Sequence, residues 1–291
     1  MEIWPNFFIG GAGKAGTTSL YEYLKQVDKI FLPKVKEPNY FSKSIDSKIL
    51  LTNPIKDKKK YLKLYENVTN EIAIGDASPT YLWDPQAPKL IHEKIPNAKF
   101  IFILRNPIER AFSHYLFLIS LGSEIDAFEH AIKKSLSFKH DYNGRILELG
   151  FYGEQLERYF HLFDKNQIKV LFFEEFFKNI QFYLKETIQF LGINHDVNKI
   201  EVNLQYNPFT IPRNDFSKKL IQNNTLRKLG KNLIPRDVLP EIKKLVDKKA
   251  QKPKMLKDDR NTLKTIYLED IKKLKTILKR ELPWDDFNNL G

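Results

Sequence analysis

Residues that suit an anion site follow the first apolar run of the chain. The run Phe7 to Ile9 ends in glycines, and after it come Lys14 and a set of small and hydroxyl residues: Gly13, Ala15, Gly16, Thr17, Thr18 and Ser19. Loop glycines let backbone N–H groups approach an anion closely. A helix that begins after such a loop adds unpaired N–H groups and a favourable dipole. The stretch is therefore predicted to bind a phosphate or a sulfate, with Lys14 as a movable positive charge.

The loop departs from the phosphate loop of nucleoside triphosphatases, which has the pattern G-x-x-x-x-G-K-[ST]. Phe8 stands at the position of the first Gly, and Ala15 stands at the position of the hydroxyl residue that binds Mg²⁺. Asp76, at the end of the apolar run 72–74, imitates the Asp of a Walker-B strand. We therefore favour an anion that needs no metal, and a small-molecule kinase that uses ATP and Mg²⁺ remains an alternative.

A second charged position follows the strongest strand signal in the chain, Ala98 to Leu104. Arg105 comes directly after this run, and Ser113 follows eight residues later, on a helix expected to start near Pro107. Arg105 alternatively pairs with a carboxylate such as Glu109, and Ser113 is alternatively a serine on the helix face. Two sets of polar residues at two strand-to-helix junctions form a more specific signal than either set alone.

The two sets together resemble the sulfotransferases that use 3′-phosphoadenosine 5′-phosphosulfate (PAPS). Residues 13–20 resemble the P-K-[TS]-G-T-T-x-L loop of that family, with Gly13 at its Pro and Ala15 at its hydroxyl residue. In the family this loop holds the 5′-phosphosulfate, and an Arg and a Ser spaced like Arg105 and Ser113 bind the 3′-phosphate. The resemblance implies the same roles for these residues here, with PAPS as donor and no metal requirement.

Further segments are similar to the branch that contains the glycan sulfotransferases. Residues 36–41 resemble its K-E-x-x-[FY]-F segment, which implies that Glu37 is the catalytic base. Residues 76–81 resemble its E-K-[ST]-P-x-Y segment. The stretch that ends at Tyr152 resembles a G-x-Y motif, and residues 207–213 loosely resemble the cofactor-closing loop. These matches imply cofactor contacts by Tyr152 and Arg213, although Arg213 is alternatively a surface charge.

Three points of the site stay open at the level of sequence. Ala77 replaces the family Lys that lies by the acceptor, which leaves the acceptor class open. Glu37 is alternatively a solvated loop carboxylate, and His114 is the second candidate for the base because other branches of the family use a histidine. The resemblance covers residues 5–195 well and the C-terminal third poorly.

Sulfuryl transfer resembles phosphoryl transfer, in which positioning and charge stabilisation dominate. Lys14 would neutralise charge on the leaving phosphate oxygen, and the loop N–H groups would bind the sulfuryl oxygens. Glu37 would deprotonate the acceptor, an effect that contributes typically about 10²–10⁴-fold. The expected reaction is transfer to a hydroxyl, with an amine as second choice, of a carbohydrate or another small metabolite.

Composition sets outer limits on these interpretations. The chain has 291 residues, a formal net charge of 48 − 36 = +12, and no cysteine. No apolar run reaches the length of a membrane span, no signal peptide is recognisable, and no nucleic-acid-binding motif is present, so we expect a cytoplasmic protein. The charge also leaves open a non-catalytic module that binds acidic glycans. The sequence does not indicate an oligomeric state.

The elements that position these residues alternate between strand and helix. Strands are expected at 6–9, 30–33, 72–76, 98–104 and 168–172, and helices at 17–26, 57–65, 85–94, 107–119, 154–163, 184–191, 215–229 and 263–278. This order predicts a three-layer, P-loop-like α/β fold with a central parallel sheet flanked by helices and a helical C-terminal region. We expect one domain over 1–291, with a core at 5–195, an irregular segment at 203–213, and the C-terminal helical part 203–291 packed on the core.

Overall fold

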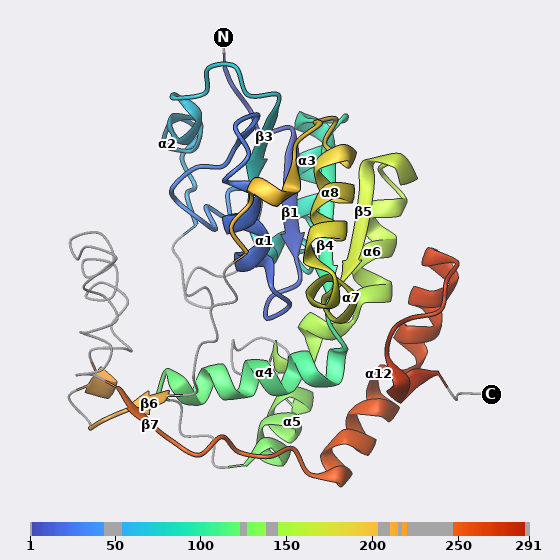
Figure 1. Cartoon of the computed structure of the whole chain (residues 1–291). Helices are drawn as coiled ribbons and strands as arrows, with labels where there is room; N and C mark the ends of the chain where they lie inside the picture. Colours follow the sequence, from blue (N-terminus) through green and yellow to red (C-terminus); the bar gives the residue numbers. More distant parts are fainter. Residues whose placement is uncertain are drawn as a thin grey trace. The chain divides into compact units, whose positions relative to one another are not determined.

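The computed structural model of the chain describes residues 2–43, 54–122, 127–137, 145–202, 210–214, 217–219 and 247–288 (Figure 1). The chain forms two compact units. Unit 1 consists of Met1–Arg110, Glu148–Leu204 and Leu263–Gly291, and unit 2 consists of Ala111–Leu147 and Gln205–Thr262. The expectation of a single domain over 1–291 stays a prediction.

Unit 1 is built on a five-stranded parallel sheet with the strand order β2-β3-β1-β4-β5 (Figure 1). Its strands are β1 (Phe7–Gly11), β2 (Ile30–Phe31), β3 (Ala73–Asp76), β4 (Lys99–Leu104) and β5 (Ile168–Phe172). β1 lies between β3 and β4, and in the register Phe8 is opposite Asp76 on one side and Phe100 on the other. The predicted parallel sheet is therefore confirmed, and all five of its strands fall at the expected positions.

One face of the sheet is aliphatic because side chains alternate between the two faces of a strand. Ile9 of β1, Ile101 and Ile103 of β4, and Leu171 of β5 are buried in one core. This core is covered by the helices α1 (Thr17–Leu24) and α8 (Ile180–Phe190), which contribute Leu20, Leu24, Leu184 and Ile188. Gly192 follows α8 with φ +84°, the left-handed conformation that commonly ends a helix.

The opposite face is aromatic. The rings of Phe8 and Phe100 stack at 5.5 Å between centroids, and those of Phe100 and Phe102 stack at 5.9 Å. Tyr159 of α6 (Tyr152–Phe160) lies edge-on to Phe100 and Phe102, at 4.9 and 4.8 Å. The helix α3 (Ala87–Lys94) covers the same side through His92, whose ring contacts that of Phe163. Helices on both faces complete the expected three layers.

Shorter elements connect this framework. They are α2 (Lys58–Leu62), α7 (Phe173–Lys178) and the 3₁₀ turns η1 (Lys63–Tyr65), η2 (Pro79–Tyr81), η4 (Glu148–Gly150), η5 (Lys165–Gln167), η6 (Val197–Lys199) and η7 (Asp285–Phe287). The helix predicted at 57–65 is thus an α-helix followed by a 3₁₀ turn. Asp57 caps α2 by accepting a hydrogen bond of 2.8 Å from the Lys60 N–H.

The C-terminal part of unit 1 packs on α6. α12 (Lys257–Leu278) contains the helix predicted at 263–278, and Tyr267, Ile271 and Leu274 are buried on one of its faces. The Asp270 carboxylate accepts hydrogen bonds of 2.8 Å from the N–H groups of Gly153 and Glu154, in the first turn of α6. An acidic group at a helix N-terminus is stabilising, and here it comes from another helix.

Unit 2 contains most of α4 (Pro107–Ser120), the helix α5 (Phe128–Ser137), and an antiparallel pair of strands, β6 (Thr210–Pro212) and β7 (Asp247–Lys249). The prediction of an irregular segment at 203–213 is therefore wrong at Thr210–Pro212. These residues form the strand β6, which pairs with β7. Residues 203–209 of that segment lie outside the described residues. Of the helix predicted at 215–229, only 217–219 are described, and these are helical.

The sheet predicts a stability effect at Gly75 of β3. A Cβ at this position would lie 2.3 Å from Cζ of Phe7 and 2.7 Å from a methyl group of Leu32. Gly75→Ala should therefore destabilise the protein by about 1–3 kcal/mol, the usual cost of overpacking a core. Urea unfolding measures this. Gly13→Ala is the matched control, because a Cβ there meets nothing within 4 Å; equal stability of the two variants would contradict the packing described.

Candidate active site

The anion loop connects β1 to α1 without a side-chain cap. The Ala12 N–H donates to the Ile103 carbonyl of β4 at 2.8 Å, which fixes the start of the loop against the neighbouring strand. Gly16 has φ +93°, and a Cβ on it would lie 2.8 Å from the Phe177 ring. Both conditions require glycine at this position. No side chain caps the first turn of α1, so its N–H groups suit an anion.

Lys14 lies in this loop with a left-handed backbone (φ 69°) and a partly buried side chain. Burial, and after it the charges of Arg105 and Arg110, lower the pKa of the Lys14 ammonium from 10.5 to about 8. The Glu37 carboxylate acts in the opposite direction. A desolvated cation next to two arginines favours a bound anion, because the anion offsets both burial and repulsion.

Arg105 follows β4 and faces the same loop. Its guanidinium lies over the Phe173 ring at 4.7 Å, and its Nη1 donates to the Lys14 carbonyl at 3.5 Å. Burial lowers the pKa of Arg105 from its usual value, against the opposing charges of Glu109 and Glu174. Tyr152 is fully buried, and its hydroxyl donates to the Arg105 carbonyl at 3.0 Å. In this structure Tyr152 therefore fixes the backbone of Arg105, and its direct contact with a cofactor stays a prediction.

Residues from two distant segments hold the turn after β4, and sequence reasoning gave them no role. The Asn106 N–H donates to Glu174 at 2.9 Å, and the Asn106 side chain donates to Asp286 at 2.8 Å. Glu174 also accepts from the indole N–H of Trp284 at 2.9 Å. Trp284 is 1% exposed and lies 5.4 Å from the Phe172 ring. In the sequence, residues 284–286 (Trp-Asp-Asp) do not by themselves indicate that they support the turn after β4.

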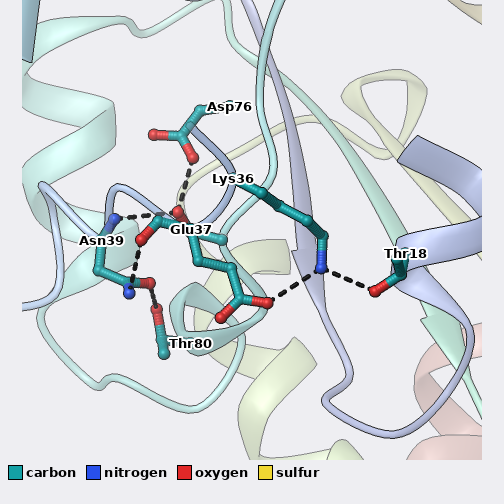
Figure 2. A network of polar contacts seen from close by, with 7 residues as sticks. Thr18, Lys36, Glu37, Asn39, Asp76 and Thr80 are labelled. Carbon is teal, nitrogen blue, oxygen red and sulfur yellow. Dashed lines mark hydrogen bonds and ion pairs between the residues drawn. The ribbon is translucent and has the colours of Figure 1, made fainter. Parts of the chain in front are cut away.

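Glu37 is connected to the anion loop by the residue before it. The Lys36 ammonium is 2.9 Å from the Glu37 carboxylate and donates to the Thr18 hydroxyl at 2.8 Å. Figure 2 shows this ammonium between the two groups. The Lys36 and Glu37 side chains are 21% and 30% exposed, so both remain accessible from solvent. One cation thus joins the first turn of α1 to the predicted base.

Asp76 does not have the surroundings of a Walker-B aspartate. It is fully buried, and its carboxylate accepts hydrogen bonds from the hydroxyls of Tyr61 (2.7 Å), Ser78 (2.7 Å) and Tyr81 (2.8 Å). Burial raises the pKa of Asp76 from 3.8 to about 6, while the three donors oppose that shift. A carboxylate with both oxygens occupied by hydroxyl donors is not placed to hold Mg²⁺, which removes the main support for the kinase alternative.

Unit 1 brings most of the predicted site together. Gly13 to Ser19, Arg105 and Glu37 are connected through the contacts of Lys14 and Lys36 described above. Arg110 joins them as an additional cation that sequence reasoning missed, although it lies in the same motif as Arg105. Ser113, His114 and Arg213 belong to unit 2. Their roles stay predictions, and so do the individual assignments of the unit 1 residues.

This loop, its paired arginines and the parallel sheet correspond to a known class of protein. Residues 5–275 match the family model of the sulfotransferase domain, and the chain belongs to this family.

Individual relatives agree with that class. Human carbohydrate sulfotransferase 15 is 25% identical over 276 residues, which cover 76% of this chain and 49% of that protein. Human heparan sulfate glucosamine 3-O-sulfotransferase 3B1 is 27% identical over 199 residues, which cover 65% and 46%. The crystal structure of a sulfotransferase from Alicyclobacillus acidocaldarius is 26% identical with a TM-score of 0.73 and covers 96% of this chain and 98% of that one. The chain spans about half the length of the curated relatives it matches.

Two features are absent from the part of the chain that the structure describes. None of the described helices combines the length and the apolar character needed to span a bilayer. The same residues contain no group of three or more His, Asp or Glu side chains placed to hold a metal ion. The metal independence and the cytoplasmic location expected from the sequence stay predictions.

The lowered pKa of Lys14 predicts that anion binding takes up a proton. In the free protein the ammonium loses its proton near pH 8, and a bound phosphate would restore it. The affinity for 3′-phosphoadenosine 5′-phosphate should therefore fall by up to about tenfold per pH unit above pH 8. Calorimetry at pH 8.5 in buffers of different ionisation enthalpy measures the proton uptake.

Lys14→Met is the control for this titration. It should abolish the proton uptake at pH 8.5 and weaken binding already at pH 7. Unchanged uptake in this variant would show that another group titrates.

Proposed function

We propose that this protein transfers the sulfuryl group of PAPS to a hydroxyl group of an acceptor. The observation that carries the proposal is the contact of Arg105, after β4, with the Lys14 loop after β1, where burial and the charges of Arg105 and of Arg110 in α4 lower the pKa of Lys14. Such a site fits a donor with several negative charges. PAPS supplies the sulfuryl group, and its 5′-phosphosulfate and 3′-phosphate are the negative groups that these cations would bind.

The residues of the chain divide the work between donor and acceptor. Lys14 and the N–H groups of the loop stabilise charge on the leaving phosphate and on the sulfuryl oxygens. Arg105 and Ser113 bind the 3′-phosphate, and Arg213 closes over the cofactor. Glu37 accepts the proton of the acceptor hydroxyl while the new S–O bond forms and the S–O bond to the phosphate breaks.

Lys36 contacts both the predicted base and the first turn of α1. Its ammonium holds Glu37 and Thr18 at 2.9 and 2.8 Å. The sulfuryl group must pass between the anion loop and the base, and Lys36 lies between these two elements (Figure 2). We infer that Lys36 keeps the base oriented before the substrates bind and adds positive charge near the transferred group.

A carbohydrate with an anionic substituent is the acceptor that we propose. A cavity of about 170 Å³ lies beside the Glu37 loop and is lined by Asn39, Tyr40, Ser42, Lys43, Pro54 and Lys56. Lys43 lies over the Tyr40 ring at 4.5 Å, and burial together with Lys56 lowers its pKa. Aromatic rings and lysines suit the apolar face of a sugar and a negative group on it. The relatives named for carbohydrate and heparan sulfate chemistry support the same class.

The direct test compares ligands of the two enzyme classes. 3′-Phosphoadenosine 5′-phosphate should raise the melting temperature of the protein, and ATP with Mg²⁺ should raise it less. Transfer of labelled sulfate from PAPS to a panel of oligosaccharides should continue in EDTA. Stabilisation by ATP with Mg²⁺ alone, together with activity lost in EDTA, would support the kinase instead. Salt-sensitive glycan binding without turnover would support the non-catalytic module.

Glu37→Gln tests the base. The amide keeps the shape of the side chain and cannot accept the proton, so kcat should fall by about 10²–10⁴-fold. Affinity for 3′-phosphoadenosine 5′-phosphate should change little, because the anion loop and Arg105 are untouched. Steady-state kinetics and calorimetry separate the two effects. Glu66→Gln, on an exposed residue after η1, is a surface control. An unchanged kcat in Glu37→Gln would leave His114 as the candidate base.

A further inference from the structure

The buried carboxylate of Asp76 begins a chain of hydrogen bonds that ends at the backbone of Glu37 (Figure 2). The Ser78 hydroxyl has a single hydrogen, and it donates this hydrogen to Asp76 at 2.7 Å. The Ser78 oxygen is thereby left to accept, and it receives the Asn39 N–H at 3.1 Å. The direction of this chain is set by Asp76, because an ionised carboxylate can only accept.

Asn39 carries the chain on to the base. Its side-chain Nδ2 donates to the Glu37 carbonyl at 2.9 Å, and its Oδ1 accepts from the Thr80 hydroxyl at 2.7 Å. The Glu37 N–H donates to the Ala77 carbonyl at 3.0 Å. The N–H of Glu37 is thus held by Ala77, which follows β3, and its carbonyl is held by Asn39 of the hydrogen-bond chain.

The loop needs this support because its backbone is strained. Glu37 has φ 60° and Asn39 has φ 51°, in the left-handed region that side-chain-bearing residues rarely occupy. Such conformations persist where the surroundings fix them, and they concentrate at functional sites. Asp76, Ser78 and Asn39 are all at least 99% buried, so water does not compete for these bonds.

We propose that Asp76 is a positioning residue for sulfuryl transfer: through Ser78 and Asn39 it holds Glu37 in the left-handed conformation that directs its carboxylate toward the anion loop. The inference rests on the proposed function of Glu37 as base. In this proposal Asp76 acts on the acceptor side of the reaction, and it contacts neither the donor nor a metal ion.

Ser78→Ala tests the link while keeping Asp76 in place. The variant removes the acceptor of the Asn39 N–H, so kcat should fall at least tenfold. The KM for PAPS and the affinity for 3′-phosphoadenosine 5′-phosphate should stay within about twofold, because the Lys14 loop does not take part. Amide hydrogen exchange should become faster at residues 37–41 and stay unchanged at residues 14–20.

Two further variants complete the series. Asp76→Asn puts an amide NH₂ group, a donor, where the hydroxyls of Ser78 or of the tyrosines need an acceptor. As in Ser78→Ala, kcat should fall while the KM for PAPS stays nearly unchanged. Tyr65→Phe is the matched control: the Tyr65 hydroxyl donates to the Tyr61 hydroxyl at 3.4 Å, and it lies outside the chain from Asp76 through Ser78 to Asn39. This control should keep wild-type kcat and wild-type exchange at 37–41.

The outcomes separate the two proposals. Wild-type kcat or unchanged exchange at 37–41 in Ser78→Ala overturns the positioning role, even where Asp76→Asn fails to fold. A fall in PAPS affinity equal to the fall in kcat also overturns it, because the effect would then be general. A wild-type protein that binds 3′-phosphoadenosine 5′-phosphate but transfers no sulfate overturns the proposed function, and with it the role of Glu37 on which the inference depends.

Discussion

The crowding of positive charge at the ends of β1 and β4 is the constraint on which the rest of the site depends. Lys14 and Arg105 follow adjacent strands, and both have lowered pKa values because burial removes water from them. Arg110 adds a third charge nearby. Cations held this way destabilise the free protein and favour a bound anion. The surrounding structure therefore has to hold them in place against their own repulsion.

Long-range contacts provide that support. The Phe173 ring covers the Arg105 guanidinium, Tyr152 holds the Arg105 carbonyl, and Glu174 fixes the next residue. Trp284, 110 residues from Glu174 in the chain, donates to the Glu174 carboxylate. The C-terminal segment of unit 1 thus acts on the anion site through the turn after β4, and a hydrogen bond to a charged group is among the stronger ones.

The acceptor side has its own support, and Lys36 is one connection between it and the donor side. The backbone of Glu37 is fixed by the hydrogen-bond chain through Asp76, Ser78 and Asn39. Its carboxylate is joined to Thr18 by Lys36. Donor binding and base positioning therefore depend on different residues. The Lys36 ammonium and the charge interaction between Glu37 and Lys14 are contacts through which one side can influence the other. This division is what allows changes in kcat to be separated from changes in donor affinity.

The sequence by itself determined the strands, most helices and the loop around Lys14, because apolar periodicity and glycine placement are local properties. It also placed Arg105 and Glu37, since each lies in a contiguous motif. Only the tertiary structure decided the role of Asp76, whose sequence position equally suits a metal ligand until Tyr61, Ser78 and Tyr81 are seen to occupy its oxygens. The support from Trp284 and the lowered pKa of Lys14 likewise depend on distances in the folded chain and on burial, which no local pattern encodes.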